Sequence, residues 1–304
     1  VNENVINGYV SGGTTMTNLV YLSHFDEATD GATSWTPTVG PAGTAVNDTH
    51  IDNGSAKFGS LSLRYLTSLN QGAYITDSAD FDLAGSNFTI DFWVNFNGTL
   101  PTAGQCQAIG NAENWQVRFQ SGGSWSRMSF VSWDTSDTEH DIYFNADPRS
   151  GLLDASGWHH FAWVRSGSTM YFFKDGTLKG TDTINWTIRT TSTGAGGANP
   201  YLFSDQYGDW DTNFAGWVDE IRILNGTAAW TSGFTPETSA YEATTVTDLT
   251  LISTSTTAEA TATTGDLVVL IENAEGTATL GTDIKGYISR NGNANYSTAV
   301  TWVD

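Results

Sequence analysis

The segment from Phe88 to Phe96 alternates apolar and polar side chains along nearly its whole length, and this pattern constrains the fold more than any other feature. Successive side chains of a β-strand point to opposite faces. One face of this segment carries Phe88, Ile90, Phe92, Val94 and Phe96, and the other carries Thr89, Asp91, Trp93 and Asn95. A face made only of large apolar side chains has to lie against a core, so the pattern predicts a strand with one side buried.

This segment is one of a series of similar segments between residues 19 and 224. They are residues 19–25, 57–63, 88–96, 115–120, 125–133, 141–146, 158–165, 170–174 and 216–224. Turn residues separate them, such as Ser-Gly-Gly at 121–123, Asp-Gly at 175–176 and a glycine-rich run at 194–197. No apolar pattern with the helical period of 3.6 residues lasts for more than a turn. The sequence therefore predicts an all-β protein, an antiparallel two-sheet sandwich of the jelly-roll type.

The composition changes near residue 240, which predicts a domain boundary. Aromatic residues are frequent before this point and nearly vanish after residue 246, where threonine, alanine and valine dominate. The first 16 residues are polar and rich in glycine and threonine, as connectors often are. We expect an N-terminal arm or connector at residues 1–16, the jelly roll at 17–240 and a small β-domain at 245–304.

The charge balance narrows the possible partners. The 304 residues include 12 Lys and Arg against 33 Asp and Glu, a formal net charge of −21. Phosphate backbones and anionic membrane surfaces repel such a chain, so we expect neither nucleic acid nor a membrane as its main partner. With 12 Trp and only 15% charged residues, the composition is nevertheless that of a folded protein. The single cysteine, Cys106, excludes an internal disulfide and a cysteine-based metal cluster.

Six motifs occur in an order that resembles a known family. They are His24-Phe25-Asp26, Phe58-Gly59-Ser60-Leu61-Ser62-Leu63, residues 87–94 (NFTIDFWV), 158–165 (WHHFAWVR), 173–176 (FKDG) and 216–223 (GWVDEIRI). As a set they are similar to the laminin-G-like branch of the concanavalin A-like lectin/glucanase superfamily, over roughly residues 18–236. The resemblance implies a concanavalin A-like jelly roll.

Further segments resemble parts of phage virion proteins. Residues 231–236 (TSGFTP) are similar to the end of such domains in phage virion proteins and secreted bacterial proteins. Residues 265–268 (GDLV) and 284–290 (IKGYISR) resemble a small β-module of phage tail and fibre proteins. The resemblance implies a tail-fibre or decoration protein at a virion surface or in the extracellular space. Its partners would be other virion subunits, or further copies of this chain in a homotrimer.

Asp26 and Asp219 are candidate ligands of a structural calcium ion. Strand alternation places Asp219 on the face of Ile221 and Ile223, where a carboxylate is costly unless it is hydrogen-bonded or binds a cation. In related jelly rolls, an acid of the last strand, an acid near the first strand and backbone carbonyl groups hold calcium. The resemblance therefore implies a Ca²⁺ site formed by Asp219, Asp26 and the carbonyl group of Gly59. The alternative is that both acids accept hydrogen bonds from backbone amides in tight turns.

Two acidic runs, at residues 134–141 and 205–211, are further candidates for a cation at a loop tip. Neither has the glycine and glutamate spacing of an EF-hand loop, and solvated loops are the alternative for both. Trp133 directly precedes the first run and Trp210 lies within the second, and both tryptophans are candidates for exposure.

Carbohydrate binding requires flat apolar rings for pyranose faces and planar polar groups for hydroxyls. The segment from Asn114 to Trp133 supplies both, because its polar side chains alternate with aromatic ones. On one face of a sheet, these side chains would form a surface for a cell-surface or extracellular polysaccharide. The candidate sugar-binding residues are Gln116, Arg118, Trp125, Arg127, Trp133, Tyr143 and Trp210. The alternative is that the rings fill the sandwich, since tryptophan is usually buried in large part.

The sequence lacks motifs for catalysis. Glycosidases of this superfamily carry paired acids on one strand, in the order Glu-x-Asp-x-x-Glu, and neither Asp91 nor residues 139–141 have that spacing. His159 and His160 occupy adjacent strand positions that face opposite ways, so we expect them not to act as a pair. We predict a non-catalytic glycan-binding or adhesion module. The alternatives are a purely structural virion spacer or assembly protein, and a carbohydrate-active enzyme of glucanase-like fold.

Overall fold

The computed structural model of the chain describes residues 18–66, 72–97, 104–111, 114–121, 126–146, 157–191, 199–203 and 214–242. The expected N-terminal arm at 1–16 and β-domain at 245–304 lie outside the described residues, as do Trp125 and Trp210. These assignments stay predictions. Among the described residues, no helix has the length and apolarity that a membrane crossing needs.

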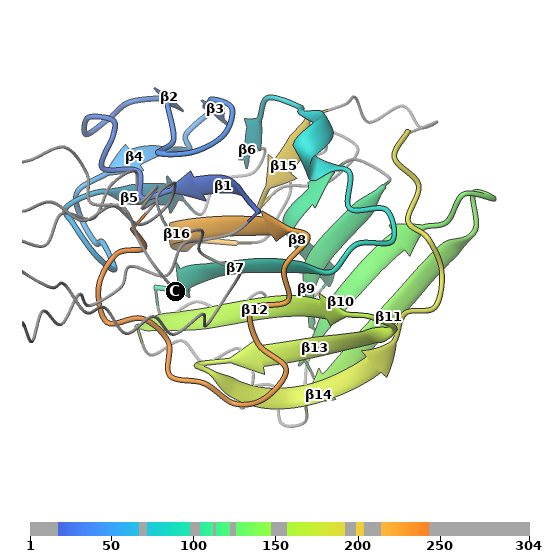
Figure 1. The fold of residues 1–304 in the computed structure, drawn as a ribbon. Coiled ribbons are helices and arrows are strands. Elements are labelled where there is room, and N and C mark those ends of the chain that lie inside the picture. Colours follow the sequence, from blue (N-terminus) through green and yellow to red (C-terminus); the bar gives the residue numbers. More distant parts are fainter. Residues whose placement is uncertain are drawn as a thin grey trace, which may run out of the picture. The chain divides into compact units, whose positions relative to one another are not determined.

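Within the described residues, sixteen strands form two antiparallel sheets (Figure 1). The strands of the first sheet are β1 (Leu19–Ser23), β4 (His50–Asp52), β5 (Ser62–Tyr65), β7 (Phe88–Asn95), β12 (Trp158–Ser166), β13 (Thr169–Lys174), β14 (Thr177–Thr183) and β16 (Gly216–Asn225). They follow the order β14-β13-β12-β7-β16-β5-β4, and β1 also pairs with β16.

The strands of the second sheet are β2 (Ser34–Trp35), β3 (Gly43–Val46), β6 (Gly72–Ile75), β8 (Gly104–Asn111), β9 (Trp115–Ser121), β10 (Ser126–Trp133), β11 (Glu139–Ala146) and β15 (Pro200–Leu202). Their order is β11-β10-β9-β8-β15-β6-β3-β2. A short 3₁₀ helix, η1 (Ala79–Phe81), precedes β7. The prediction of an all-β sandwich of the jelly-roll type is confirmed.

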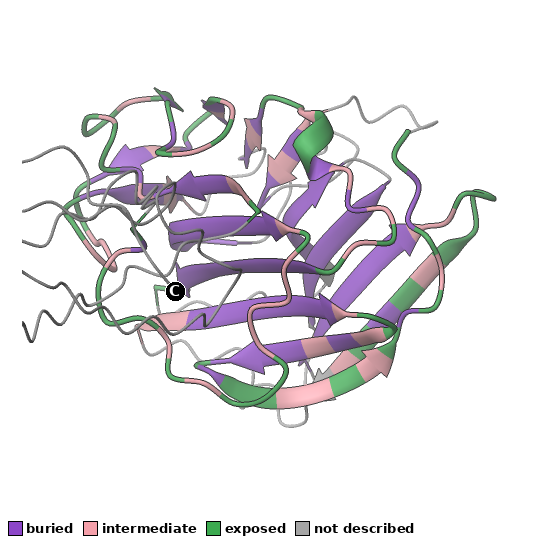
Figure 2. Ribbon diagram, viewed as in Figure 1, coloured by how far each residue is buried: buried purple, intermediate pink, exposed green. Residues whose placement is uncertain are grey.

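The core lies between the two sheets. The apolar face of β7 is fully buried there, as its alternation predicts, and its members are Phe88, Ile90, Phe92 and Val94, followed by Phe96. The second sheet contributes Trp115, Val117 and Phe119 from β9 and Met128 and Phe130 from β10. Figure 2 shows β7 and β16 buried along nearly their whole length, whereas the edge strand β14 is largely exposed or half-buried. Burial of the strands therefore decreases from β7 at the centre of the sheet to β14 at its edge.

The predicted strand at residues 57–63 is mostly a loop. Strand β5 begins only at Ser62 and continues to Tyr65. The backbone N–H groups of Lys57 and Leu61 donate to carboxylates instead of to a neighbouring strand. The prediction of a strand there is wrong because these side-chain acceptors replace the ladder partners of residues 57–61.

A β-bulge in β16 changes the face that Asp219 occupies. Glu220 has a φ of +53°, and the pairing of β16 with β7 shifts register directly after Asp219. Ile221 and Ile223 point into the core, while Asp219 lies opposite Trp93, on the outer side of the sheet. The prediction that Asp219 shares a face with these isoleucines is wrong, because the extra residue breaks the alternation.

Residues 226–242, which we call the C-terminal strap, cross the outer face of the first sheet (orange in Figure 1). Trp230 and Phe234 stack on each other with ring centres 3.7 Å apart, and both pack against a small apolar cluster. That cluster consists of Ala162, Val164 and Phe173, from β12 and β13. The strap is thus packed onto the jelly roll up to its last residues.

Candidate functional site

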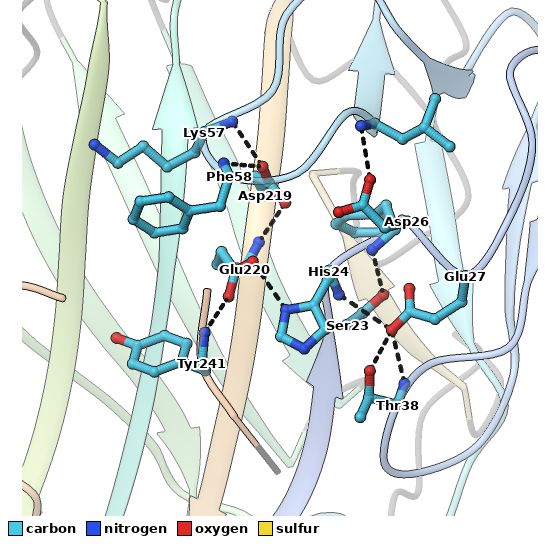
Figure 3. A network of polar contacts seen from close by, with 12 residues as sticks. Ser23, His24, Asp26, Glu27, Thr38, Lys57, Phe58, Asp219, Glu220 and Tyr241 are labelled. Carbon is cyan, nitrogen blue, oxygen red and sulfur yellow. Dashed lines mark hydrogen bonds and ion pairs between the residues drawn. The ribbon is translucent and has the colours of Figure 1, made fainter. Parts of the chain in front are cut away.

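The loop of residues 57–61 brings together the three residues predicted to hold calcium: it contains Gly59 and is contacted by Asp26 and Asp219 at its two ends. Figure 3 shows both acids beside this loop. Asp219 is fully buried. Its Oδ2 accepts hydrogen bonds from the N–H groups of Lys57 (2.7 Å) and Phe58 (3.3 Å), and its Oδ1 accepts one from Glu220 N–H (2.8 Å). Burial, together with the charge of Glu220, raises the pKa of Asp219 well above its usual value despite these hydrogen bonds.

Asp26 holds the other end of the same loop. Its Oδ1 accepts hydrogen bonds from the N–H and hydroxyl groups of Ser60 (2.8 and 3.1 Å) and from Leu61 N–H (3.0 Å). Gly59 has a φ of +62°, and a Cβ at this position would overlap the Asp26 carboxylate. Asp26 and Asp219, which are far from Gly59 in the sequence, thus hold the turn around Gly59 in place.

Calcium takes oxygen ligands, whereas the groups that face Asp26 and Asp219 in this turn are N–H and O–H donors. Among the described residues, no group of three or more His, Cys, Asp or Glu side chains is arranged to hold a metal ion. The described geometry is that of the alternative, in which acids cap turn amides. The calcium ion stays a prediction that rests on the resemblance.

Glu220 joins two distant segments beside this turn (Figure 3). It is buried, its Oε1 lies 2.8 Å from His24 Nδ1, and its Oε2 accepts a hydrogen bond from Tyr241 N–H (3.0 Å). Burial alone lowers the pKa of His24, but the hydrogen bond and the charge of Glu220 outweigh it and raise the pKa above its usual 6.5. Strand alternation does not single out Glu220, because the residue lies in the bulge.

Asp91, weighed as a catalytic acid, is the centre of a buried ion network on the outer face of the first sheet. Its Oδ1 accepts a hydrogen bond from Arg222 Nε (2.8 Å), and its Oδ2 accepts one from the Tyr241 hydroxyl (2.6 Å) and lies 3.0 Å from His160 Nε2. Burial alone would raise the pKa of Asp91. The charge of Arg222 and the hydrogen bond from His160 outweigh burial, so the pKa is lowered. A carboxylate with no exposed surface and three partners holds the fold together and does not meet a substrate.

The two adjacent histidines of β12 lie beside different acids. His159 Nδ1 lies 2.8 Å from Asp175 Oδ2, and His160 belongs to the network of Asp91.

The acidic run at 134–141 is a hydrogen-bonded loop. Asp134 Oδ1 accepts hydrogen bonds from the N–H groups of Ser136 (2.8 Å) and Thr138 (3.0 Å), and Oδ2 lies 3.0 Å from His140 Nε2. The hydrogen bond with His140 and those from the amides lower the pKa of Asp134 to about 2. These contacts match the loop alternative rather than a cation site. The second run, 205–211, lies outside the described residues.

Strands β8 to β11 carry a set of mostly polar side chains on the side away from the core, which we call the polar face. One row of directly paired residues crosses all four strands, from Gln107 through Arg118 and Ser129 to Tyr143. The rows on either side of it contain Gln120 with Arg127, and Gln116 with Val131 and Asp141. Trp133 ends the face, opposite Glu139. Because paired residues on adjacent strands point to the same side, these side chains gather on one surface.

Hydrogen bonds and ring contacts connect the charged groups of the polar face. Arg118 Nε donates to Gln116 Oε1 (2.5 Å), and Arg127 Nε donates to Gln120 Oε1. The Arg127 guanidinium also lies over the ring of Tyr143, with 4.3 Å from Cζ to the ring centre. Arg127 Nη2 is 3.8 Å from Asp141 Oδ2. These contacts fix planar groups in defined orientations.

Burial on the polar face is uneven. Gln116 and Ser129 are fully buried and Gln107 nearly so, whereas Tyr143 on the edge strand β11 is 41% exposed. Among the described side chains, Gln107 Nε2 and Ser129 Oγ are buried polar atoms of this face that have no hydrogen-bond partner. Such atoms are costly to leave unsatisfied.

Five predicted sugar-binding residues meet on the polar face, and the other two, Trp125 and Trp210, lie outside the described residues. The five are Gln116, Arg118, Arg127, Trp133 and Tyr143. Sequence reasoning missed Gln107 and Ser129. The alternation of residues 105–108, in which glutamines flank Cys106, is the signal that could have indicated Gln107.

A family model described as the concanavalin A-like lectin/glucanases superfamily matches residues 68–231, which is more than half of the chain. The chain belongs to this superfamily. A comparison with curated proteins gives no match.

Several solved structures are similar to this superfamily member at low sequence identity. The binding domain of Paraclostridial Mosquitocidal Protein 1 has a TM-score of 0.49 and 15% identity, and the match covers 68% of this chain and 49% of that one. The binding domain of botulinum neurotoxin DC in complex with SialylT has a TM-score of 0.47 and 13% identity, with 68% and 48% covered. Domain 4 of AbnA, an extracellular arabinanase of Geobacillus stearothermophilus in complex with arabinotriose, has a TM-score of 0.48 and 15% identity, with 70% and 95% covered.

The chain thus spans about half the length of the toxin binding domains that it matches. All three TM-scores are below 0.5, so we infer neither ligand nor site from these similarities.

Proposed function

We propose that this protein is a non-catalytic glycan-binding module and that the polar face binds the glycan. The row from Gln107 through Arg118 and Ser129 to Tyr143 carries the proposal, because it leads from planar polar groups to a half-exposed ring. Amide and guanidinium groups donate to sugar hydroxyls in fixed directions, and a tyrosine ring offers a flat apolar surface to a pyranose. Membership in a superfamily of lectins and glucanases supports a carbohydrate ligand.

The non-catalytic part of the proposal rests on the acids. Glycoside hydrolysis needs two carboxyl groups that flank the scissile bond. Asp91 is buried in its ion network, and Asp219 is buried under the loop of residues 57–61. On β11, Glu139 and Asp141 match the first two acids of the order Glu-x-Asp-x-x-Glu, but Phe144 stands where the third acid would be required. Within the described residues, these contacts favour binding over cleavage.

A glycan array followed by calorimetry on the best ligand tests the proposal. We expect the Tyr143→Ala variant to bind that ligand about tenfold more weakly, because the ring contact is lost. Leu178→Ala is the matched control, since Leu178 on β14 is the other large apolar side chain that is exposed among the described residues. Absence of any glycan ligand would remove the carbohydrate proposal, and unchanged affinity in Tyr143→Ala would remove the polar face as its site.

The finer setting is also a proposal. We infer from the resemblance of residues 231–236, 265–268 and 284–290 that the module belongs to a phage virion surface protein, with other virion subunits as partners. A purely structural spacer is the alternative, and it predicts that Tyr143→Ala changes the assembly state instead of ligand affinity. Size-exclusion chromatography of the same two variants separates these outcomes.

A further inference from the structure

A hollow of about 470 Å³ lies on the outer side of the first sheet, across the sandwich from the polar face. Its volume falls in the range of about 300–1,000 Å³ that small-molecule sites occupy. Segments far apart in the sequence line it, namely Lys57 and Phe58, Trp93, Trp158 and His159, Asp175, and Pro236, Glu237 and Thr238 of the C-terminal strap. Figure 3 shows the side chains of Lys57 and Phe58 pointing away from Asp219.

Two of the lining residues, Trp93 and Lys57, carry hydrogen-bond donors. Trp93 is only 6% exposed, and its indole Nε1–H has no hydrogen-bond partner among the described residues. The ammonium group of Lys57 lies 3.8 Å from the centre of the Trp93 ring. A buried N–H group without an acceptor is costly, so an acceptor on a ligand would be favourable here.

The rim supplies acceptors and apolar surface. Asp175 and Glu237 are exposed carboxylates, and Thr238 adds a hydroxyl. Asp175 already contacts His159 Nδ1 and accepts a hydrogen bond from His160 N–H, so Glu237 is the freer acceptor of the two. Phe58, Trp158 and Pro236 add rings that are half-buried, so part of each stays accessible.

A fitting ligand must therefore accept hydrogen bonds, donate them, and present apolar faces to rings. Two carboxylates disfavour an anionic ligand, and the ammonium of Lys57 disfavours a cationic one. We infer that this hollow is a second binding site, distinct from the polar face, for a neutral pyranose unit of an oligosaccharide. The inference goes beyond the proposed function because it rests on other residues, on the other sheet, and it makes the module bivalent for glycans.

Nuclear magnetic resonance of the full chain, labelled with ¹⁵N in its tryptophan side chains, tests both sites at once. Cellotriose, maltotriose and mannotriose are titrated separately, and the indole N–H signals of Trp93 and Trp133 report on the hollow and on the polar face. Each signal is assigned by its loss in the Trp93→Phe or Trp133→Phe variant. We expect at least one trisaccharide to shift the Trp93 signal.

The double variant Lys57→Gln with Glu237→Gln should weaken binding at Trp93 about tenfold or more, since two polar partners are lost. The pair Lys179→Gln with Glu242→Gln makes the same charge changes outside the hollow and should leave the affinity unchanged. Tyr143→Ala should alter only the Trp133 signal.

Three results would overturn the second site. They are a silent Trp93 signal with all three trisaccharides, equal affinity in the Lys57 and Glu237 double variant, and loss of the Trp93 shift in Tyr143→Ala. A Trp93 shift with a silent Trp133 supports the hollow and counts against the polar face, so failure of one site is distinguishable from failure of the other.

Discussion

Gly59 lies where the loop of residues 57–61 passes closest to Asp26. Its φ of +62° belongs to the left-handed region, and a Cβ there would overlap the Asp26 carboxylate. Gly31 also has a left-handed φ, +79°, but a Cβ at that position would meet no atom within 4 Å. The two glycines share the backbone requirement and differ in the space around them.

Replacing Gly59 with alanine is expected to lower the free energy of unfolding by about 2–4 kcal/mol, because backbone strain and steric overlap add. Gly31→Ala should lower it by only about 1 kcal/mol, from strain alone. Urea unfolding followed by tryptophan fluorescence measures both. Equal losses in the two variants would contradict the close packing of Asp26 on this turn.

Tyr241 connects the C-terminal strap to the centre of the first sheet. Its hydroxyl donates to Asp91 Oδ2 (2.6 Å), its N–H donates to Glu220 Oε2 (3.0 Å), and its ring lies 3.9 Å from Cζ of Arg222. The strap therefore closes the outer face of β7, β12 and β16 by polar contacts as well as by the stacked Trp230 and Phe234.

The Tyr241→Phe variant is expected to lose about 1–3 kcal/mol of unfolding free energy, because one buried hydrogen bond to a charged acceptor disappears. Tyr171→Phe, on β13, is the matched control and should change stability by less than about 0.5 kcal/mol.

The pKa of Asp91 is lowered in the fold, so the ionised carboxylate stabilises the protein above pH about 4, and this contribution is lost as the pH falls below that value. Melting curves between about pH 7 and pH 3 follow both effects. Equal stability of the two variants would mean that the strap is held by its apolar contacts alone.

Strand alternation predicts β7 correctly, because each inward position of β7 is a large apolar residue. It misses β8, where small residues and glutamines give little contrast between the faces. It also cannot foresee the bulge at Glu220, since the extra residue leaves no trace in composition. The pairing of Asp91 with Tyr241 joins positions 150 residues apart, which one sequence cannot reveal. The polar face could be predicted in part. Alternation predicts which residues of β9 and β10 point away from the core, but it does not predict which strands lie beside these two.

The whole molecule combines a net charge of −21 with two outer surfaces of different chemistry. The polar face contains Arg118 and Arg127, while the outer face of the first sheet buries the ion network around Asp91 and exposes the carboxylates of Asp175 and Glu237. A molecule this acidic is stabilised by added cations through screening alone, without a specific site. Stabilisation by calcium would therefore reveal a bound ion only when compared with another divalent cation.

We expect calcium and magnesium at equal concentration to raise the melting temperature of the full chain equally. Screening depends on charge, and the carboxylates of Asp26 and Asp219 already accept hydrogen bonds from the loop of residues 57–61. A specific calcium ion at one hundred times its Kd would instead add about 2.7 kcal/mol, which corresponds to a shift of several degrees for a domain of this size. A calcium-specific shift that a chelator reverses, that Asp26→Asn abolishes and that Asp182→Asn retains would establish the calcium site implied by the resemblance. The same result would show that the turn around Gly59 rearranges to present oxygen atoms to the ion.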